Sequence, residues 1–325
     1  MGVPLISIVM PLFNKEKEVD RAIRSAISQT FADFELIVIN DGSTDKSPDV
    51  VRACRDDRIS MIDQANQGVS AARNRGIMEA KADLVAFLDA DDEWKPDFLE
   101  TIMKLVSTFP EASVFATGYT IKQIGIGERS SLIRGLPDLF SKGILMDYFA
   151  VAAQSDPPLW TSAVAVTKEA ITSIGGFPVG VTAGEDLLTW ARLAVKYKIA
   201  YSIKPAALFW MPLSLSDRPE CVPQHPDIVV LQLEELSQQT GQENASLKAY
   251  IALWHRMRAT IFMRMGAKKE ALHELRRSIR LAGTNANVMI LLFISVLPIK
   301  FGLALYKVLK RWQLRVFDAK SIARL

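Results

Sequence analysis

Short apolar runs alternate with segments of helical periodicity along the first two thirds of the chain. Residues 5–10, 34–39 and 84–88 form nearly continuous apolar runs, which are typical of strands covered on both faces. Between them, apolar side chains recur at three- and four-residue spacing over residues 19–27 and 69–77. This order of strands and helices predicts an α/β fold with a mainly parallel sheet and flanking helices.

The remaining elements of this part follow from weaker patterns. Residues 59–62, 113–120 and 162–167 are predicted strands, and a helix is predicted to open at Gly184. Residues 121–137 show no clear period and are predicted to form a mobile loop.

The chain from Asn244 onward carries a different, all-helical pattern. Apolar side chains at helical spacing predict two helices separated by Gly266. Residues 288–306 are almost entirely apolar, but Pro298 and Lys300 interrupt them, and a spanning helix needs about 20 mostly apolar residues. We therefore expect an interfacial or re-entrant helix pair at a membrane surface, with a dimer interface as the alternative.

Charge is divided unevenly between these two parts. The formal net charge is +3, but residues 1–243 hold 23 Lys and Arg against 33 Asp and Glu, whereas residues 244–325 hold 16 against 3. Such asymmetry predicts different partners for the two parts. An anionic membrane surface fits the basic tail better than nucleic acid does, because the tail also contains long apolar runs.

The cysteines and the start of the chain indicate a compartment. Cys54 and Cys221 are isolated, which argues against a disulfide framework or a zinc site and favours a reducing environment. The first 13 residues are apolar but have no basic segment, which indicates a buried strand rather than a cleavable signal. We therefore expect a cytoplasmic protein.

Acidic side chains gather directly after two predicted strands and at one predicted helix start. Asp41 follows the second apolar run, Asp89 and Asp91 follow the third, and Asp186 lies where the later helix begins. Open α/β sheets bind ligands at the carboxyl ends of their strands. If residues 89–91 are extended, the carboxylates of Asp89 and Asp91 point the same way and can share a hard divalent cation.

Five segments in a fixed order carry a family resemblance. They are SIVMPLFN at 7–14, VINDGSTD at 38–45, NQGVSAARNRG at 66–76, FLDADD at 87–92 and GED at 184–186. Together they resemble the inverting family-2 glycosyltransferases of the GT-A fold, of the bacterial type that builds cell-surface glycans. The resemblance covers roughly residues 5–210, and it is specific because all five segments, including the DXD pattern, occur in family order.

The resemblance implies a role for each polar residue of these segments. Asp41 would accept a hydrogen bond from a uracil-type imide, Asp89 would contact the ribose or a bridging water, and Asp91 would bind Mg²⁺ or Mn²⁺. Asp186 would be the general base, with Glu185 as the alternative and a candidate acceptor contact. The nucleoside pocket would be completed by Pro11, Phe13 and Asn66.

Structural alternatives exist for several of these residues. Phe13 is alternatively a core aromatic, and Asp41 a turn residue. Arg73 follows two alanines that allow close packing, so we expect it to reach a phosphate or a carbonyl edge, with an ion pair to a carboxylate as the alternative. Asp92 is expected to adjust the local field or cap a helix, and Asp186 alternatively only meets a helix dipole.

Acceptor recognition is less well defined by the sequence. Trp160 is the candidate for contact with an acceptor sugar, although most aromatics at such positions fill the core. Many relatives carry a histidine after the strand near Leu208, whereas this chain has Trp210 and Met211 there. We therefore expect that diphosphate binding differs in this protein.

These observations predict the organisation of the chain. Residues 1–215 would form the GT-A catalytic domain, with a nucleotide-binding half at about 1–110 and an acceptor half at about 111–215. A linker and first helix would occupy 216–243, and a basic helical region 244–325.

The predicted activity is metal-assisted, inverting transfer of a sugar, from a UDP-linked donor to a glycan or lipid-linked acceptor. The enzyme would be peripheral at the inner face of the membrane. One alternative is a catalytically inactive nucleotide-sugar-binding or scaffold protein, which the acidic residues disfavour. The other is a nucleotidyltransferase of related fold, which would normally show a Gly-rich, basic phosphate loop near the first strand.

Overall fold

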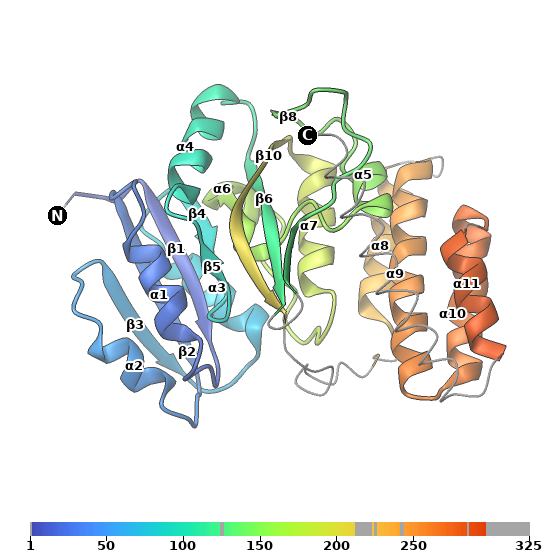
Figure 1. Ribbon diagram of the computed structural model, residues 1–325, viewed down its shortest axis with the longest axis horizontal. Coiled ribbons are helices and arrows are strands. Elements are labelled where there is room, and N and C mark those ends of the chain that lie inside the picture. The colour runs from blue at the N-terminus through green and yellow to red at the C-terminus, as the bar shows by residue number, and fades with distance from the viewer. Residues whose placement is uncertain are drawn as a thin grey trace. The chain divides into compact units, whose positions relative to one another are not determined.

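The structure is a computed structural model with two compact units, Met1–Pro219 and Glu220–Leu325. The first unit is built around one sheet, and the second consists of helices (Figure 1). The residues that the structure describes are 2–123, 127–211, 223, 226–240, 244–284 and 286–296.

Four parallel strands form one half of the sheet in the first unit. In spatial order they are β3 (Ile59–Gln64), β2 (Phe34–Asp41), β1 (Ile6–Leu12) and β4 (Leu84–Phe87). Ile6 on β1 lies between Phe34 on β2 and Leu84 on β4. The apolar start of the chain is therefore an inner strand, as the sequence predicts.

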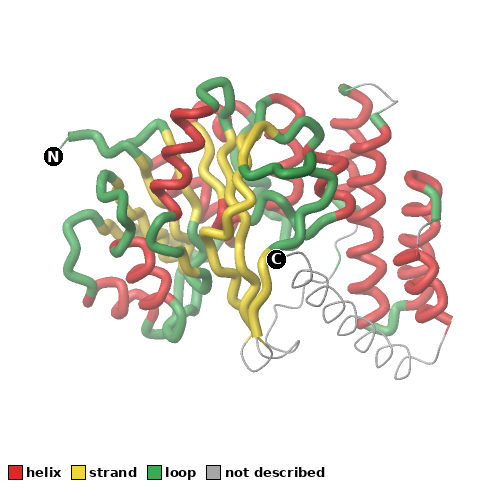
Figure 2. Tube along the Cα trace, turned by 45° about the horizontal axis from the view of Figure 1, so that its top comes forward, coloured by secondary structure: helices red, strands yellow, loops and turns green. Residues whose placement is uncertain are grey.

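The other half of the sheet includes antiparallel pairings. Figure 2 shows the strands of the sheet in yellow. The strands of this half are β9 (Val164–Thr167), β6 (Val114–Gln123), β10 (Ile199–Met211), β5 (Glu93–Trp94), β7 (Gly127–Ser130) and β8 (Lys142–Ile144). β9 pairs antiparallel with both β4 and β6, whereas β10 runs parallel to β6. The α/β fold with a largely parallel sheet is confirmed.

One predicted loop is wrong in part. Residues 121–137 include the end of β6 and all of β7, which pair antiparallel, with Thr120 opposite Ser130 and Gln123 opposite Gly127. β7 carries no buried residue, so it lacks the apolar alternation on which strand prediction depends. Backbone pairing to β6 forms this strand, and a single sequence segment does not reveal such a partner.

Helices cover both faces of the parallel half-sheet, which explains its continuous apolar strands. The helices of this unit are α1 (Val19–Ile27), α2 (Ser47–Ala53), α3 (Val69–Glu79), α4 (Phe98–Thr108), α5 (Tyr148–Gln154), α6 (Lys168–Ser173) and α7 (Glu185–Lys196), with the short 3₁₀ turn η1 (Thr161–Ala163). Buried residues of α1 and α4 share a core with Ile8 on β1. On the other face, a Cβ at Gly76 of α3 would lie 2.3 Å from a Val9 methyl carbon, so only glycine permits this approach.

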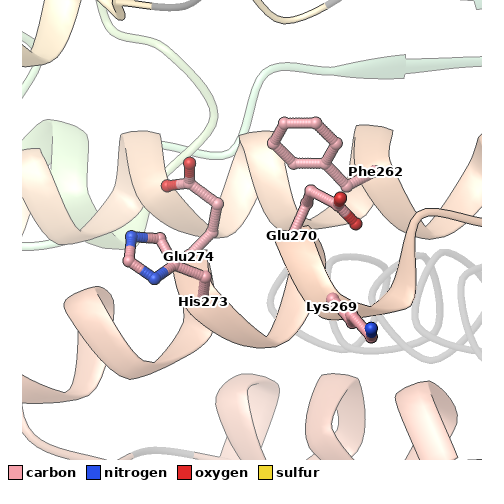
Figure 3. A pocket seen from close by; sticks show the side chains of 5 residues that line it. All are labelled: Phe262, Lys269, Glu270, His273 and Glu274. Atoms are coloured by element: carbon pink, nitrogen blue, oxygen red, sulfur yellow. The ribbon is translucent and has the colours of Figure 1, made fainter.

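The described residues of the second unit form the helices α8 (Ile228–Gln239), α9 (Ala245–Arg264), α10 (Lys268–Ala282) and α11 (Ala286–Val296). Gly266, with φ +79°, separates α9 from α10 where the sequence predicts a break. Apolar residues such as Phe262, Leu275 and Ile294 join α9, α10 and α11 in one core. Figure 3 shows a pocket of about 250 Å³ in this unit, lined by Phe262, Lys269, Glu270, His273 and Glu274.

The apolar stretch at 288–306 is described only as far as Val296. Its first part belongs to α11, while Pro298, Lys300 and the basic residues after them lie outside the described residues. Within the described ranges, none of the helices combines the length and apolar character that membrane crossing requires.

Candidate active site

The ends of β1 and β2 carry the predicted nucleoside residues. Pro11 lies near the end of β1, and Phe13 follows the strand with 45% of its side chain exposed, so Phe13 is a surface aromatic and not a core one. Asn66 is exposed, and its backbone nitrogen would lie 3.0 Å from a Cβ on Gly42. Because Gly42 directly follows Asp41, this close approach brings Asn66 beside the end of β2.

Asp41 is buried, and its carboxylate already accepts hydrogen bonds from other residues of the protein. Its carboxylate accepts hydrogen bonds from Gln64 Nε2 at 2.8 Å and from the backbone N–H groups of Gln67 and Gly68 at 2.9 and 2.8 Å. A carboxylate offers about four acceptor positions, so three donors leave room for one more. The carboxylate is therefore less free than the sequence suggested, and its contact with a nucleobase stays a prediction.

The DXD segment forms a turn and not an extended strand. β4 ends at Phe87, and the backbone N–H of Asp92 donates to the carbonyl of Asp89 at 3.0 Å. The expectation that residues 89–91 continue the strand is therefore wrong. The turn is needed because the chain must reverse to place Trp94 in β5, which pairs antiparallel with β10.

Arg73 ties the DXD turn to the start of α7. Its guanidinium is 4% exposed and contacts Asp89 Oδ1 at 2.8 Å and Glu185 Oε1 at 3.2 Å. It also lies 5.0 Å from the centre of the Phe177 ring. The ion pair considered as an alternative for Arg73 is therefore present, and its Nε is buried without a partner among the described residues.

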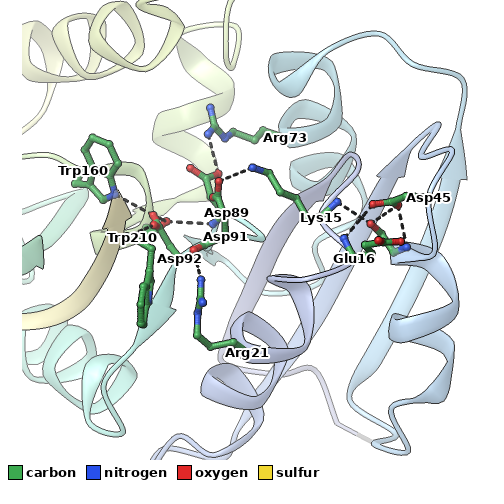
Figure 4. A network of polar contacts seen from close by, with 12 residues as sticks. Lys15, Glu16, Arg21, Asp45, Arg73, Asp89, Asp91, Asp92, Trp160 and Trp210 are labelled. Atoms are coloured by element: carbon green, nitrogen blue, oxygen red, sulfur yellow. Dashed lines mark hydrogen bonds and ion pairs between the residues drawn. The ribbon is translucent and has the colours of Figure 1, made fainter. Parts of the chain in front are cut away.

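Two cationic side chains other than Arg73 contact Asp91. Lys15 Nζ contacts its Oδ2 at 2.7 Å, and a terminal guanidinium nitrogen of Arg21 donates to its backbone carbonyl at 2.7 Å (Figure 4). Arg21 also lies 4.1 Å from the centre of the Trp210 ring. The carboxylate of Asp91 is 40% exposed, so it remains open to a ligand.

Asp92 is the buried centre of the turn. Its carboxylate accepts hydrogen bonds from Ser162 Oγ at 2.6 Å, Trp160 Nε1 at 3.0 Å and the backbone N–H of Trp210 at 3.3 Å. Burial, reinforced by the charges of Asp91 and Asp89, raises the pKa of Asp92 to about 8. The residue thus joins three segments of the fold, more than the local adjustment that the sequence indicated.

Trp160 is packed as well as hydrogen bonded. Its ring lies 4.2 Å from that of Phe209 and 5.6 Å from that of Tyr119, measured between centroids, and it is only partly buried. Trp94 and Trp190 are buried core residues. A contact between Trp160 and an acceptor sugar therefore stays a prediction, because part of its surface is open but its nitrogen is used.

Asp186 belongs to the same charged cluster as Asp89 and Arg73. It lies in the first turn of α7, after Gly184 with φ +81°. Burial and the adjacent charge of Glu185 raise the pKa of Asp186 to about 7, while Arg73 opposes this shift. A carboxyl group with such a pKa exchanges a proton readily near neutral pH.

The acidic turn fits a metal ion that is shared with a phosphorylated ligand. Asp89 and Asp91 each hold a cationic side chain at 2.7–2.8 Å, so both carboxylates already accept positive charge. Within the described part of the chain, no group of three or more His, Cys, Asp or Glu side chains is arranged to hold a metal. Mg²⁺ is usually bound by one or two carboxylates together with substrate phosphates and water. Asp89 and Asp91 could supply such carboxylates.

Sequence reasoning missed the cations and the hydroxyl group that organise the acidic turn. They are Lys15, Arg21 and Ser162. Lys15 directly follows the motif at 7–14, and this position was the one available signal. Arg21 and Ser162 lie in a helix and a 3₁₀ turn whose sequences resemble ordinary structural segments.

The sequence of the chain is similar to those of known glycosyltransferases. Residues 7–156 match the model of "Glycosyl transferase family 2". The uncharacterized glycosyltransferase alr2836 of Nostoc sp. is 42% identical over 106 residues, which cover 32% of this chain and 33% of that protein. The match therefore spans about a third of that relative's length.

Solved structures share the fold at low sequence identity. The crystal structure of S. aureus TarS 1–349 in complex with UDP-GlcNAc superposes with a TM-score of 0.64 at 17% identity, and the match covers 85% of this chain and 81% of that one. The mannosyltransferase PcManGT from Pyrobaculum calidifontis, in complex with GDP-Man and Mn²⁺, gives 0.56 at 19% identity, covering 96% and 84%. Residues 7–156 are therefore similar to glycosyl transferase family 2, and the chain shares the GT-A fold of these solved structures.

Proposed function

We propose that this protein transfers a sugar from a UDP-linked donor to a hydroxyl group of a glycan or lipid-linked acceptor, with inversion at the anomeric carbon. The observation that carries the proposal is Arg73, whose buried guanidinium contacts both Asp89 and Glu185. Two acidic segments that are distant in sequence therefore meet at one cation. This arrangement supports a single site in which Asp186 lies close to the residues assigned to the donor.

Asp186 acts as the general base in this proposal. In a single displacement, the acceptor hydroxyl loses its proton as its oxygen attacks the anomeric carbon, and a carboxylate must take that proton. A pKa of about 7 leaves a large part of Asp186 ionised at neutral pH and still makes it a better base than an ordinary carboxylate. Glu185 is held by Arg73, which favours Asp186 as the residue that is free to accept the proton.

The donor would be held by residues at the strand ends. Phe13, Asn66 and the remaining acceptor position of Asp41 would bind the nucleoside, and Asp89 the ribose. Asp91 would hold Mg²⁺ or Mn²⁺, which when bound would neutralise the charge on the departing diphosphate. Arg21 fixes the backbone of Asp91 and so keeps its carboxylate in place.

Thermal unfolding in the presence of nucleotide-sugars tests this proposal. A donor at about 100 times its Kd should stabilise the protein by about 2.7 kcal/mol by mass action. UDP-sugars should do so more strongly with Mn²⁺ than without it, and Asp91→Ala should lose the Mn²⁺-dependent part. Asp49→Ala, at an exposed carboxylate on α2, is the matched control and should keep it. If no nucleotide-sugar stabilises the wild-type chain under either condition, the proposal is wrong.

We further propose that the C-terminal unit binds an anionic membrane surface and holds the enzyme at the inner, cytoplasmic face. Met289 and Phe293 of α11 lie one helical turn apart and are 56% and 59% exposed. Exposed cations such as Lys269 and Arg280 lie on the neighbouring α10. Sedimentation with vesicles tests this: binding should require anionic lipid and weaken with salt. Equal binding to neutral vesicles, or unchanged binding after deletion of 284–325, would contradict it.

A further inference from the structure

Hydrogen bonds fix the backbone of Lys15, and its side chain contacts the DXD turn. Its N–H donates to Ser47 Oγ at 2.7 Å, and its carbonyl accepts from the N–H of Val19 at 2.9 Å at the start of α1. The preceding Asn14 has φ +52°, a conformation that few residues other than glycine adopt. This turn fixes the Cα of Lys15 and leaves a flexible four-carbon side chain to reach Asp91.

The two DXD carboxylates are neutralised in different ways. Asp89 is paired with Arg73, whose side chain is 4% exposed and contacts a second carboxylate as well. Asp91 is paired with Lys15, and both of these side chains remain about 40% exposed. A solvated lysine pair has little net stability and exchanges readily, whereas the buried arginine is a fixed part of the fold. Only the cation on Asp91 is therefore removable.

The ammonium group of Lys15 lies at the carboxylate to which a second cation, the proposed metal ion, would bind. The ammonium group of Lys15 contacts Oδ2 of Asp91 at 2.7 Å. It occupies an oxygen that the proposed metal ion would need. A divalent ion that takes Oδ2 of Asp91 would displace this ammonium group, which would then lie beside a diphosphate bound to the same ion.

We propose that Lys15 is a positioning residue that occupies Asp91 until metal and donor bind together, and then moves its ammonium group to a diphosphate oxygen. This inference rests on the proposed function. In the empty site Lys15 competes with the metal, whereas in the loaded site it binds the phosphate charge. It therefore couples the two ligands, so that each raises the affinity for the other by the same factor.

The inference predicts opposite effects of one substitution on two affinities. Lys15→Met removes the charge but keeps an unbranched side chain that is only one heavy atom shorter. It should bind Mn²⁺ alone more tightly than the wild type, by about fivefold or more, and bind UDP in the presence of Mn²⁺ more weakly by a similar factor. Lys15→Arg, which keeps the charge, should resemble the wild type in both measurements.

Full-length protein, titrated with Mn²⁺ alone, UDP alone and UDP with Mn²⁺, provides the test. Mn²⁺ binding is followed by electron paramagnetic resonance and UDP binding by calorimetry, so no turnover is needed. Lys17→Met is the matched control, because Lys17 is an exposed lysine two residues away and the change in net charge is the same. It should leave both affinities unchanged, and thermal unfolding shows whether each variant is folded.

The outcomes separate this inference from the proposed function. A wild-type chain that binds neither Mn²⁺ nor UDP overturns the proposed function and this inference with it. If the wild type binds both ligands, the inference alone is overturned when Lys15→Met leaves either affinity unchanged or shifts both in the same direction. It is overturned equally if Lys17→Met gives the same opposite shifts, since these would then reflect net charge.

Discussion

Each unit of the protein contains a buried charged network, and the two networks differ in their balance of charge. In the first unit, Asp92 and Asp186 lie near further carboxylates, and burial together with these neighbours raises their pKa values to about 8 and about 7. Asp89 is likewise raised by burial and by Asp91, despite its pair with Arg73. The acids of this network are not fully compensated.

The network of the helical unit is compensated within itself. Arg258 is 4% exposed and contacts Glu274 at 3.0 Å and Asp227 at 2.8 Å. The second oxygen of Glu274 lies 2.5 Å from His255 Nδ1, and Trp254 Nε1 donates to Asp227 at 3.0 Å. Burial raises the pKa of Glu274, but His255 and Arg258 lower it by more, so the net shift is downward.

The difference separates a structural role from a catalytic one. A network that stabilises a fold matches each buried charge, because an unmatched buried charge costs several kcal/mol. A network that performs proton transfer or binds a cation keeps groups whose charge is incomplete, and perturbed pKa values gather there. The raised pKa of Asp186 therefore supports its proposed role as the base, whereas the lowered pKa of Glu274 fits a structural role.

The largest effect is expected from replacing the proposed general base. Asp186→Asn keeps the size of the side chain but removes its basicity, so we expect transfer to fall by about 100- to 10,000-fold. Donor binding should persist, as measured by calorimetry with a UDP-sugar. Glu185→Gln is the contrasting variant and should cost less, because Glu185 pairs with Arg73. Near wild-type turnover by Asp186→Asn would refute the assignment of the base.

The next largest effect is expected from disrupting the charge-balanced network of the helical unit. Glu274→Ala leaves His255 without its buried carboxylate and Arg258 with Asp227 alone, so the free energy of unfolding should fall by roughly 3–5 kcal/mol. Chemical denaturation measures this change. Glu270→Ala, at an exposed carboxylate one turn earlier on α10, is the control and should change stability by less than about 0.5 kcal/mol. Equal effects at the two positions would show that the network stabilises nothing.

The smallest expected effect is a difference between the two networks in the pH at which activity and stability change. Asp186 must be ionised to act as a base, so kcat/KM should rise with pH by about tenfold per unit below a midpoint near 7. Glu274 has a folded-state pKa below its ordinary 4.5, so its stabilisation is complete above pH 4.5 and is lost as the pH falls through the folded value. The two titrations should therefore be separate, and a catalytic midpoint near 4 would contradict the raised pKa of Asp186.

Sequence reasoning was sound for regular elements and weak for their irregular connections. The strands at 5–10, 34–39 and 84–88 and the break at Gly266 were predictable, because burial and backbone conformation leave local patterns. β7 was not, because it forms by pairing with β6 and buries no side chain. The turn at Asp89–Asp92 was also missed, since it depends on where β5 must pair.

The chain by itself determined which acids are available, since Asp41, Asp89, Asp91 and Asp186 follow strand ends or a helix start that periodicity reveals. Only the tertiary structure decided which cation each acid meets and how far its pKa moves. Arg73 reaches Glu185 across 112 residues of sequence, and Lys15 reaches Asp91 across 76. Electrostatic energies depend on distances and burial in the folded protein, and the linear sequence gives neither quantity directly.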